Sequence, residues 1–325
     1  MRKAALLYNP RSGGRRSQRQ ADVQAVLNIL GEAGVEANLV LTQSSADAAE
    51  QARKAIAEGC DTVFACGGDG TIHDVLQAMA GTRVALGVIP MGTANALAHD
   101  LGLPLEPAKA ARAALQAEHR RIALGRVQAC DFDGNSVTRY FTVAVGIGVD
   151  AHLFYKLSTG VKQRLGMAAY YAQAWYLWFT HRMDRFAVEI GDSGNGSRAR
   201  RREGATELLA VRIRNFGGVL RELAPGASLD RNDMRVVLCQ TSSRFSYLLY
   251  VTRGLLGADW KVPGVELVHS QRVRCDYLPG ADEGAAKNPT RVYVEVDGEL
   301  VGRLPAEITM VPDALTILTP KGGRD

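Results

Sequence analysis

The sequence predicts a protein of the α/β plus β class, with an N-terminal α/β domain followed by a C-terminal β-sandwich domain. Over the first 105 residues, short apolar runs alternate with segments of helical periodicity, which is typical of right-handed βαβ units and a mostly parallel sheet. After about residue 122, alternating apolar runs separated by turn residues take over, which is the pattern of antiparallel strands. The length of 325 residues is enough for two domains.

The first domain is expected to contain four strands and the helices that connect them. The apolar runs that indicate the strands cover residues 4–8, 35–41, 61–66 and 84–89. Apolar residues at helical spacing over 23–30 predict the first helix. Ser44 and Asp47 predict a capping box at the start of the second helix, which ends near Gly59.

The second domain is expected to be mostly antiparallel sheet. Its apolar alternating runs cover residues 140–145, 208–213, 236–238, 265–268, 292–296 and 315–318. One aromatic-rich helix, at about 166–181, interrupts them. The segment 192–204 contains three glycines and four arginines, and we predict an exposed, mobile loop there.

Composition and charge exclude several classes of protein. With 46% hydrophobic and 22% charged residues, the chain is neither a disordered protein nor a small disulfide scaffold. The net charge of +5 suits phosphate ligands, nucleic acid or an anionic membrane, without choosing among them. The five cysteines are scattered, and buried free thiols are expected. The longest apolar helical stretch, 165–180, falls short of the roughly 20 residues that span a bilayer, so we predict a cytoplasmic protein.

The strongest functional signal is the turn Gly67-Gly68-Asp69-Gly70-Thr71, which directly follows a predicted strand. Backbone N–H groups in such a turn can approach a phosphate closely, at the positive end of the next helix. Asp69 would repel that phosphate unless a cation lay between them, so it suggests Mg²⁺ held with a nucleotide. The alternative is a tight turn with a helix-capping Asp. We expect Thr71 to cap the helix, with Asp74 three residues later.

A second turn of the same kind, Pro90-Met91-Gly92-Thr93-Ala94-Asn95, follows the strand at 84–89. Both turns lie at the carboxyl ends of parallel strands, which is the edge where open α/β sheets bind ligands. The first loop, 9–14, lies at the same edge. This placement favours one shared nucleotide site.

These three turns together resemble the catalytic domain of the diacylglycerol kinase and sphingosine kinase families, including the soluble bacterial lipid kinases. Later landmarks of the resemblance are Val145-Gly146-x-Gly148, Leu223-Ala224-Pro225 and Val296-Asp297-Gly298-Glu299. The resemblance implies a Rossmann-like nucleotide-binding domain of the NAD-kinase and diacylglycerol-kinase type over 1–125. It also implies a β-sandwich lipid-kinase domain over 126–306, and a final segment, 307–325, that packs back on the first domain.

The resemblance also implies the site residues of an ATP- and Mg²⁺-dependent lipid kinase that phosphorylates a hydroxyl of diacylglycerol or of a sphingoid or related lipid. ATP contacts are implied for Asn9, Thr42, Gly67, Gly68, Asp69, Gly70, Thr71, Gly92, Thr93 and Asn95. Asp69 would help to hold Mg²⁺. Asp297 or Glu299 would take the proton from the lipid hydroxyl, and the sequence leaves open which one.

Three positions depart from the pattern of the bacterial relatives. Ala96 and Ala123 stand where acidic residues are usual. An Asp-Asp-Gly segment that binds a structural Mg²⁺ in those relatives aligns with Asp230-Arg231-Asn232. Because an arginine cannot ligate a cation, we hypothesise that Arg231 replaces the charge of the ion.

The aromatic helix is the sequence feature that bears on partners. Its aromatic residues, among them Trp175 and Trp178, are explained by core packing or by a surface that meets a membrane. We expect a peripheral membrane association and no nucleic acid partner, and a homodimer is one option. The alternative functions are a small-molecule kinase of the NAD-kinase type and a non-catalytic nucleotide or lipid sensor.

Overall fold

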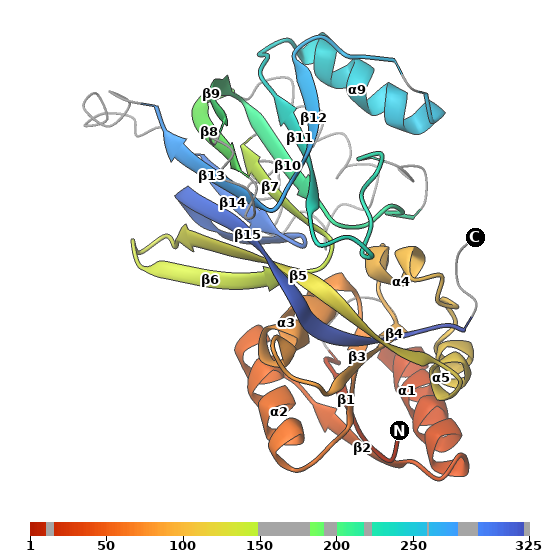
Figure 1. The fold of residues 1–325 in the computed structure, drawn as a ribbon. Helices are drawn as coiled ribbons and strands as arrows, with labels where there is room; N and C mark the ends of the chain where they lie inside the picture. The colour runs from red at the N-terminus through yellow and green to blue at the C-terminus, as the bar shows by residue number, and fades with distance from the viewer. Residues whose placement is uncertain are drawn as a thin grey trace.

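The computed structural model describes residues 1–10, 16–148, 183–191, 200–217, 223–258, 260–278 and 292–321. It has a two-domain architecture, as predicted (Figure 1). The strands of the first domain are β1 (Lys3–Tyr8), β2 (Glu36–Leu41), β3 (Thr62–Gly67) and β4 (Ala85–Pro90). Its helices are α1 (Arg16–Glu32), α2 (Ser45–Ala57), α3 (Asp69–Met79), α4 (Ala96–Asp100) and α5 (Pro107–Leu115).

The four strands of the first domain form a parallel sheet in the order β2-β1-β3-β4. Alternate residues of β1 point to opposite faces: Ala5 and Leu7 share a core with α2 and α3, whereas Leu6 shares one with α1 and α5. Both faces are therefore covered by helices, which explains why β1, β3 and β4 read as continuous apolar runs. The strand order changes direction between β1 and β3, which places a topological switch point beside the turn at Gly67.

Two helix starts show how local signals compare with the structure. At α2 the predicted cap is confirmed, because the backbone N–H of Asp47 donates to Oγ of Ser44 at 3.2 Å. At α3 the expected cap is wrong. The helix begins two residues before Thr71, at Asp69, and Gly68 is its N-cap residue without a side-chain hydrogen bond. The glycine turn itself thus forms the helix start, which leaves backbone N–H groups exposed there.

The second domain contains antiparallel strands and one described helix. The strands are β5 (Glu118–Cys130), β6 (Ser136–Phe141), β7 (Ala144–Gly148), β8 (Phe186–Gly191), β9 (Arg200–Ala205), β10 (Glu207–Val211), β11 (Met234–Cys239), β12 (Val265–Ser270), β13 (Arg272–Tyr277), β14 (Tyr293–Val296) and β15 (Glu299–Thr319). The helix is α9 (Arg244–Leu256). A layer in the order β12-β11-β10-β7-β14-β15 and a layer of β6, β5, β15, β13, β8 and β9 enclose a second core.

The long strands β5 and β15 connect the two domains. They pair with each other from Cys130 and Arg303 at one end to Glu118 and Thr319 at the other, and Figure 1 shows them running together between the two halves. Near its end β15 also pairs in parallel with β4, through Thr316 and Ala85. The expected boundaries at 125 and 306 fall inside these strands, and the domain limits stay a prediction.

Other expectations have mixed outcomes. The prediction of a loop over 192–204 is wrong at its end, because Arg200–Ala205 is a strand that pairs with β8, and tertiary pairing overrides a locally polar sequence. All five cysteines are free, and four are buried, as predicted.

The aromatic helix at 166–181 lies outside the described residues. Among the residues that are described, no helix has the length and apolar character needed to cross a membrane.

Candidate active site

The two glycine turns touch each other backbone to backbone. A Cβ atom placed on Gly92 would lie 2.5 Å from the Cα of Gly68, and one on Gly68 would lie 3.0 Å from the Cα of Gly92. The backbone N–H of Met91 donates to the carbonyl of Gly67 at 2.9 Å. A Cβ atom does not fit at Gly92, and at Gly68 it would fit only if the facing backbone shifted slightly, so the close approach requires glycine at Gly92 and favours it at Gly68.

Asp69 lies at the point where the two turns meet. It is the first residue of α3, and its Oδ1 accepts a hydrogen bond from the backbone N–H of Leu97, at the start of α4, at 3.4 Å. Burial raises the pKa of Asp69, and the nearby Asp297 adds to that rise, while backbone N–H groups of α4 oppose it. The folded protein therefore holds a half-buried carboxylate at the edge where two helices begin.

Asn95 shapes the second turn through its side chain. Its backbone adopts a left-handed conformation with φ of 49°. Its Oδ1 accepts from the N–H of Gly92 at 2.8 Å, and its Nδ2 donates to the carbonyl of Gly92 at 3.0 Å. The amide is thus used inside the turn. Thr93, by contrast, is exposed at the sheet edge.

The ends of β1 and β2 complete this edge. The backbone N–H of Thr42 donates to the carbonyl of Tyr8 at 2.9 Å, which places Thr42 beside Asn9 at the carboxyl end of the sheet. The hydroxyl of Thr42 is buried and has no hydrogen-bond partner among the described residues. A buried hydroxyl is normally hydrogen-bonded, so this one is available to a group bound at the sheet edge. Thr71 is buried under Gly67 in the first turn of α3.

The second domain supplies Asp297, which is buried and has a left-handed φ of 51°. Its carboxylate accepts hydrogen bonds from three successive backbone N–H groups, those of Thr142, Val143 and Ala144, at 3.1, 2.9 and 3.0 Å. Nδ1 of His73, from α3, lies 3.6 Å from Oδ2 of Asp297. These contacts fix the bend between β6 and β7 and hold the tight turn between β14 and β15.

Glu299 lies two residues further on and differs from Asp297 in its surroundings. It is exposed, and its Oε1 would lie 3.1 Å from a Cβ atom placed on Gly70. A carboxylate of the second domain therefore stands against the start of α3 in the first domain. Of the two acidic residues in this turn, Glu299 is the one presented to solvent beside the glycine turns.

Helix α3 is fastened to the second domain by Gln77, which no sequence signal singles out. Its Nε2 donates to the carbonyl of Tyr140 and its Oε1 accepts from the N–H of Tyr140, both at 2.9 Å. Asp100, which also lacks a sequence signal, ties the end of α4 to the second domain by accepting from the N–H groups of Arg214 and Asn215 at 2.9 and 3.0 Å. Both polar residues lie on short helices, and only the fold shows their partners.

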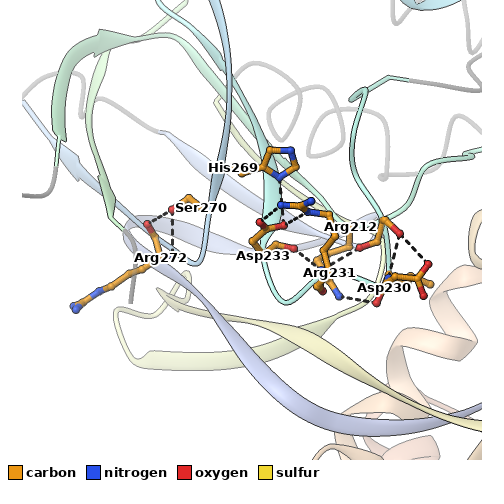
Figure 2. Close-up of polar contacts among 9 residues, drawn as sticks. Arg212, Asp230, Arg231, Asp233, His269, Ser270 and Arg272 are labelled. Atoms are coloured by element: carbon orange, nitrogen blue, oxygen red, sulfur yellow. Dashed lines mark hydrogen bonds and ion pairs between the residues drawn. The ribbon is translucent and has the colours of Figure 1, made fainter. Parts of the chain in front are cut away.

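The carbonyls of the loop 228–233 face a buried cation, the guanidinium of Arg212, which directly follows β10 (Figure 2). The Arg212 guanidinium donates to the carbonyls of Arg231 at 2.8 Å and of Ala123 at 3.0 Å. It also contacts the carbonyls of Ser228, Leu229 and Asp233. Burial lowers the pKa of Arg212 to about 10, so it stays charged at neutral pH.

The hypothesis that Arg231 replaces the charge of an ion stays a prediction, and the buried guanidinium beside this loop is that of Arg212. Arg231 is exposed, and its guanidinium pairs with the carboxylate of Asp233. Asp233 also approaches Nδ1 of His269 at 3.3 Å (Figure 2). Although burial acts in the opposite direction, the hydrogen bond from Arg231 and the charge of His269 lower the pKa of Asp233. No sequence signal distinguishes Arg212, which lies in an apolar strand end.

Comparisons with known proteins cover almost the whole chain. A family model described as "Diacylglycerol kinase catalytic domain" matches residues 3–127, and one described as "YegS C-terminal NAD kinase beta sandwich-like domain" matches residues 143–319. The chain is 27% identical over 324 residues to a diacylglycerol kinase of Bacillus subtilis (strain 168), covering 99% of this chain and 97% of that protein. It is also 27% identical over 329 residues to a diacylglycerol kinase of Mycobacterium tuberculosis (strain ATCC 25618 / H37Rv), covering 99% and 96%.

Solved structures with the same fold agree. The crystal structure of a diacylglycerol kinase from Bacillus anthracis str. Sterne matches with a TM-score of 0.68 and 17% identity, covering 98% of this chain and 97% of that one. The structure of yeast NADH kinase complexed with NADH matches with a TM-score of 0.52 and 13% identity, covering 99% and 84%. At these identities the likeness shows a shared fold.

Replacing Gly92 with Ala should destabilise the protein by roughly 2 kcal/mol, because the added methyl group overlaps Gly68 and the two turns must separate. Thermal or urea unfolding measures the loss. The matched control is Gly31→Ala in α1, where an added Cβ meets nothing within 4 Å and the φ angle is ordinary. That control should stabilise by up to about 1 kcal/mol. Equal stabilities for the two variants would contradict the backbone contact.

Replacing Arg212 with Met should destabilise the protein by on the order of 3 kcal/mol, because several buried carbonyls lose this donor. Replacing Arg231 with Met should cost less than about 1 kcal/mol, since it removes an exposed ion pair. Chemical denaturation of both variants provides the measurement. Metal analysis of the wild-type protein at low free Mg²⁺ gives a further test. One tightly held Mg²⁺ per chain in this loop would show that Arg212 does not take the place of an ion there.

Proposed function

This chain belongs to the family that joins a diacylglycerol kinase catalytic domain to a YegS-type C-terminal β-sandwich domain, and we propose that it is an ATP-dependent lipid kinase. The reaction would transfer the γ-phosphoryl group of ATP to a hydroxyl of diacylglycerol or of a sphingoid or related lipid. One observation supports this most strongly: a carboxylate of the sandwich domain, Glu299, stands against the glycine turn at Gly70 of the α/β domain.

The glycine turns fit a nucleoside triphosphate. Gly92 has no room for a Cβ and Gly68 has little, so their bare backbones form a cradle that a phosphate can approach. Helix α3 begins at this cradle without a side-chain cap, which leaves its first N–H groups available to a phosphate oxygen. The unpaired hydroxyl of Thr42 and the exposed Thr93 line the same edge.

Asp69 fits the role of a Mg²⁺ ligand. Its carboxylate is half-buried between two helix starts, and an oxygen ligand beside a phosphate cradle is what Mg²⁺ prefers. Burial raises the pKa of Asp69, and a nearby cation would offset the cost of its charge. When bound, Mg²⁺ would supply charge neutralisation for the triphosphate.

For the base that takes the proton from the lipid hydroxyl, we assign Glu299 and not Asp297. Phosphoryl transfer needs a carboxylate near the attacking hydroxyl that can accept its proton. The oxygens of Asp297 already accept three backbone N–H groups, so this residue positions the turn that carries Glu299. Glu299 is exposed on the side of the α3 start, where substrate hydroxyl and nucleotide would meet.

The lipid is proposed to be reached at a membrane surface by a cytoplasmic, peripherally bound enzyme. A lipid with long acyl chains is held in a bilayer, so the sandwich domain has to approach its headgroup from the water side. The enzyme then needs only to admit the hydroxyl-bearing end of the lipid to the region beside Glu299.

Incubation of the protein with radiolabelled ATP, Mg²⁺ and mixed micelles of diacylglycerol and sphingosine tests the proposal. Label in the organic phase is expected. Label in a soluble dinucleotide, with NAD or NADH added, would favour a kinase of the NAD-kinase type, whose fold is shared. Bound ATP without transfer to either acceptor would favour a non-catalytic sensor.

Replacing Asp69 with Asn should lower turnover about a hundredfold, because the variant loses the charge that holds Mg²⁺–ATP. Its stability should be equal or higher. The pKa of this carboxyl is raised on folding, so the protein becomes less stable as pH rises from the ordinary pKa of the group to the raised one. That loss of stability persists at neutral pH. The substituted amide keeps an oxygen for the N–H of Leu97 and carries no charge. Turnover assays and thermal unfolding at pH 7 measure both effects, and retained turnover would rule out the metal role.

Replacing Glu299 with Gln should lower kcat by about 10²–10⁴-fold with little change in thermal stability, because only the proton acceptor is lost. Replacing Asp297 with Asn should lower thermal stability, since one acceptor oxygen is replaced by a donor facing backbone N–H groups. Steady-state kinetics and thermal unfolding of both variants separate the roles. An active Glu299→Gln variant beside a stable, inactive Asp297→Asn variant would reverse the assignment.

A further inference from the structure

Helix α9 lies at the outer edge of the second domain, at the end of the molecule away from the glycine turns (Figure 1). Its inner face is fastened by tyrosines. The hydroxyl of Tyr247 is hydrogen-bonded to Oγ1 of Thr206 at 2.8 Å, and the hydroxyl of Tyr250 donates to the carbonyl of Leu223. The Arg253 guanidinium stacks over the Tyr250 ring and donates to the carbonyl of Ala258 at 3.1 Å. These contacts fix which side of the helix faces outward.

The outward side of α9 is apolar. Phe245 and Leu256 are 67% and 68% exposed, the highest values among the large hydrophobic residues that the structure describes. Leu248, Val251 and, just after the helix, Trp260 are exposed as well. Five of the nine exposed large hydrophobic residues in the described ranges therefore belong to this one segment. We call these five residues the α9 patch. Such a concentration marks an interaction surface.

Charge around the α9 patch is mostly positive. Residues 241–265 contain one acidic residue, Asp259, and three basic ones, of which Arg253 is buried on the inner face of the helix. Outside this segment, Asp184 precedes Arg185. Arg244 opens the helix, Lys261 follows the patch and is exposed, and exposed Arg185 contacts the loop that precedes the helix. An apolar helix face with cationic residues at its ends, and a Trp at its border, is the composition of helices that lie in a membrane interface.

We propose that the α9 patch docks the protein on a bilayer that contains anionic phospholipid. The apolar side chains would enter the boundary between headgroups and acyl chains, while Arg185, Arg244 and Lys261 would meet the phosphates of the headgroups. The proposal rests on the proposed function, because a kinase for a membrane lipid needs a surface that holds it at the bilayer. The positive charge favours an anionic surface over a second copy of this chain, whose α9 would carry the same charge.

Vesicle flotation without ATP tests the docking surface directly. The full-length protein is mixed with vesicles of phosphatidylglycerol and phosphatidylcholine, or of phosphatidylcholine alone. The test variant is Phe245→Ser/Leu256→Ser. The matched control is Leu39→Ser/Leu105→Ser, which removes two exposed apolar side chains, one from β2 and one from the segment before α5, in the other domain.

The test variant should partition onto phosphatidylglycerol vesicles at least about tenfold more weakly than wild type, because two large apolar side chains no longer leave water. The control variant should bind as wild type does. Binding of the wild type should fall on phosphatidylcholine alone and on raising salt from about 0.1 to about 0.5 M, because the anionic attraction is lost or screened. Unchanged thermal unfolding of the test variant shows that the inner face of α9 still holds the helix.

Three results would overturn the proposal. They are equal binding of test variant and wild type, salt-independent binding, and a change from dimer to monomer in the test variant, by light scattering, with vesicle binding retained. Phosphorylation of a dispersed short-chain diacylglycerol separates this question from the proposed function. The test variant should match the wild type there, because α9 carries no residue of the proposed site. If the wild type fails on that substrate but binds vesicles through α9, the function is wrong and the docking surface stands.

Discussion

The close approach of Gly68 and Gly92 is the constraint on which the rest of the site depends. Neighbouring parallel strands lie about 5 Å apart. Here the turns that follow β3 and β4 bend toward each other instead of away. That arrangement brings the start of α3 to the start of α4, and Asp69 can then accept a hydrogen bond from the N–H of Leu97. The result is one backbone cradle made from two turns, with a carboxylate beside it, which we propose receives the phosphates of the nucleotide.

Such a cradle is useful only if the second domain holds its own groups in register with it. Polar contacts achieve this at two points: Gln77 on Tyr140, and Asp100 on the backbone of Arg214 and Asn215. The paired strands β5 and β15 run between the same two domains. Partly buried hydrogen bonds of this kind are costly to leave unmade, so they favour one relative position of the domains.

The turn between β14 and β15 divides two tasks between two carboxylates. Asp297 sits in a left-handed conformation that costs free energy for a non-glycine residue, and three backbone N–H bonds offset that cost. Glu299 is left exposed beside Gly70. At the other end of the same domain, α9 is anchored by Tyr247 and Tyr250 while its apolar side faces water. The domain thus combines acidic residues facing the α/β domain with an exposed apolar helix face at its other end.

Local sequence signals were enough to predict the fold class, the strands of the first domain and the two glycine turns, because these depend on periodicity and on backbone conformations that only glycine allows. They did not separate Asp297 from Glu299, they did not single out Arg212 as a buried cation, and they did not single out α9. Each of these depends on groups distant in the chain: backbone N–H groups at 142–144, the carbonyl of Ala123, and the strands behind α9. Whether a charge or an apolar face is buried is decided by such neighbours, and only the tertiary structure brings them together.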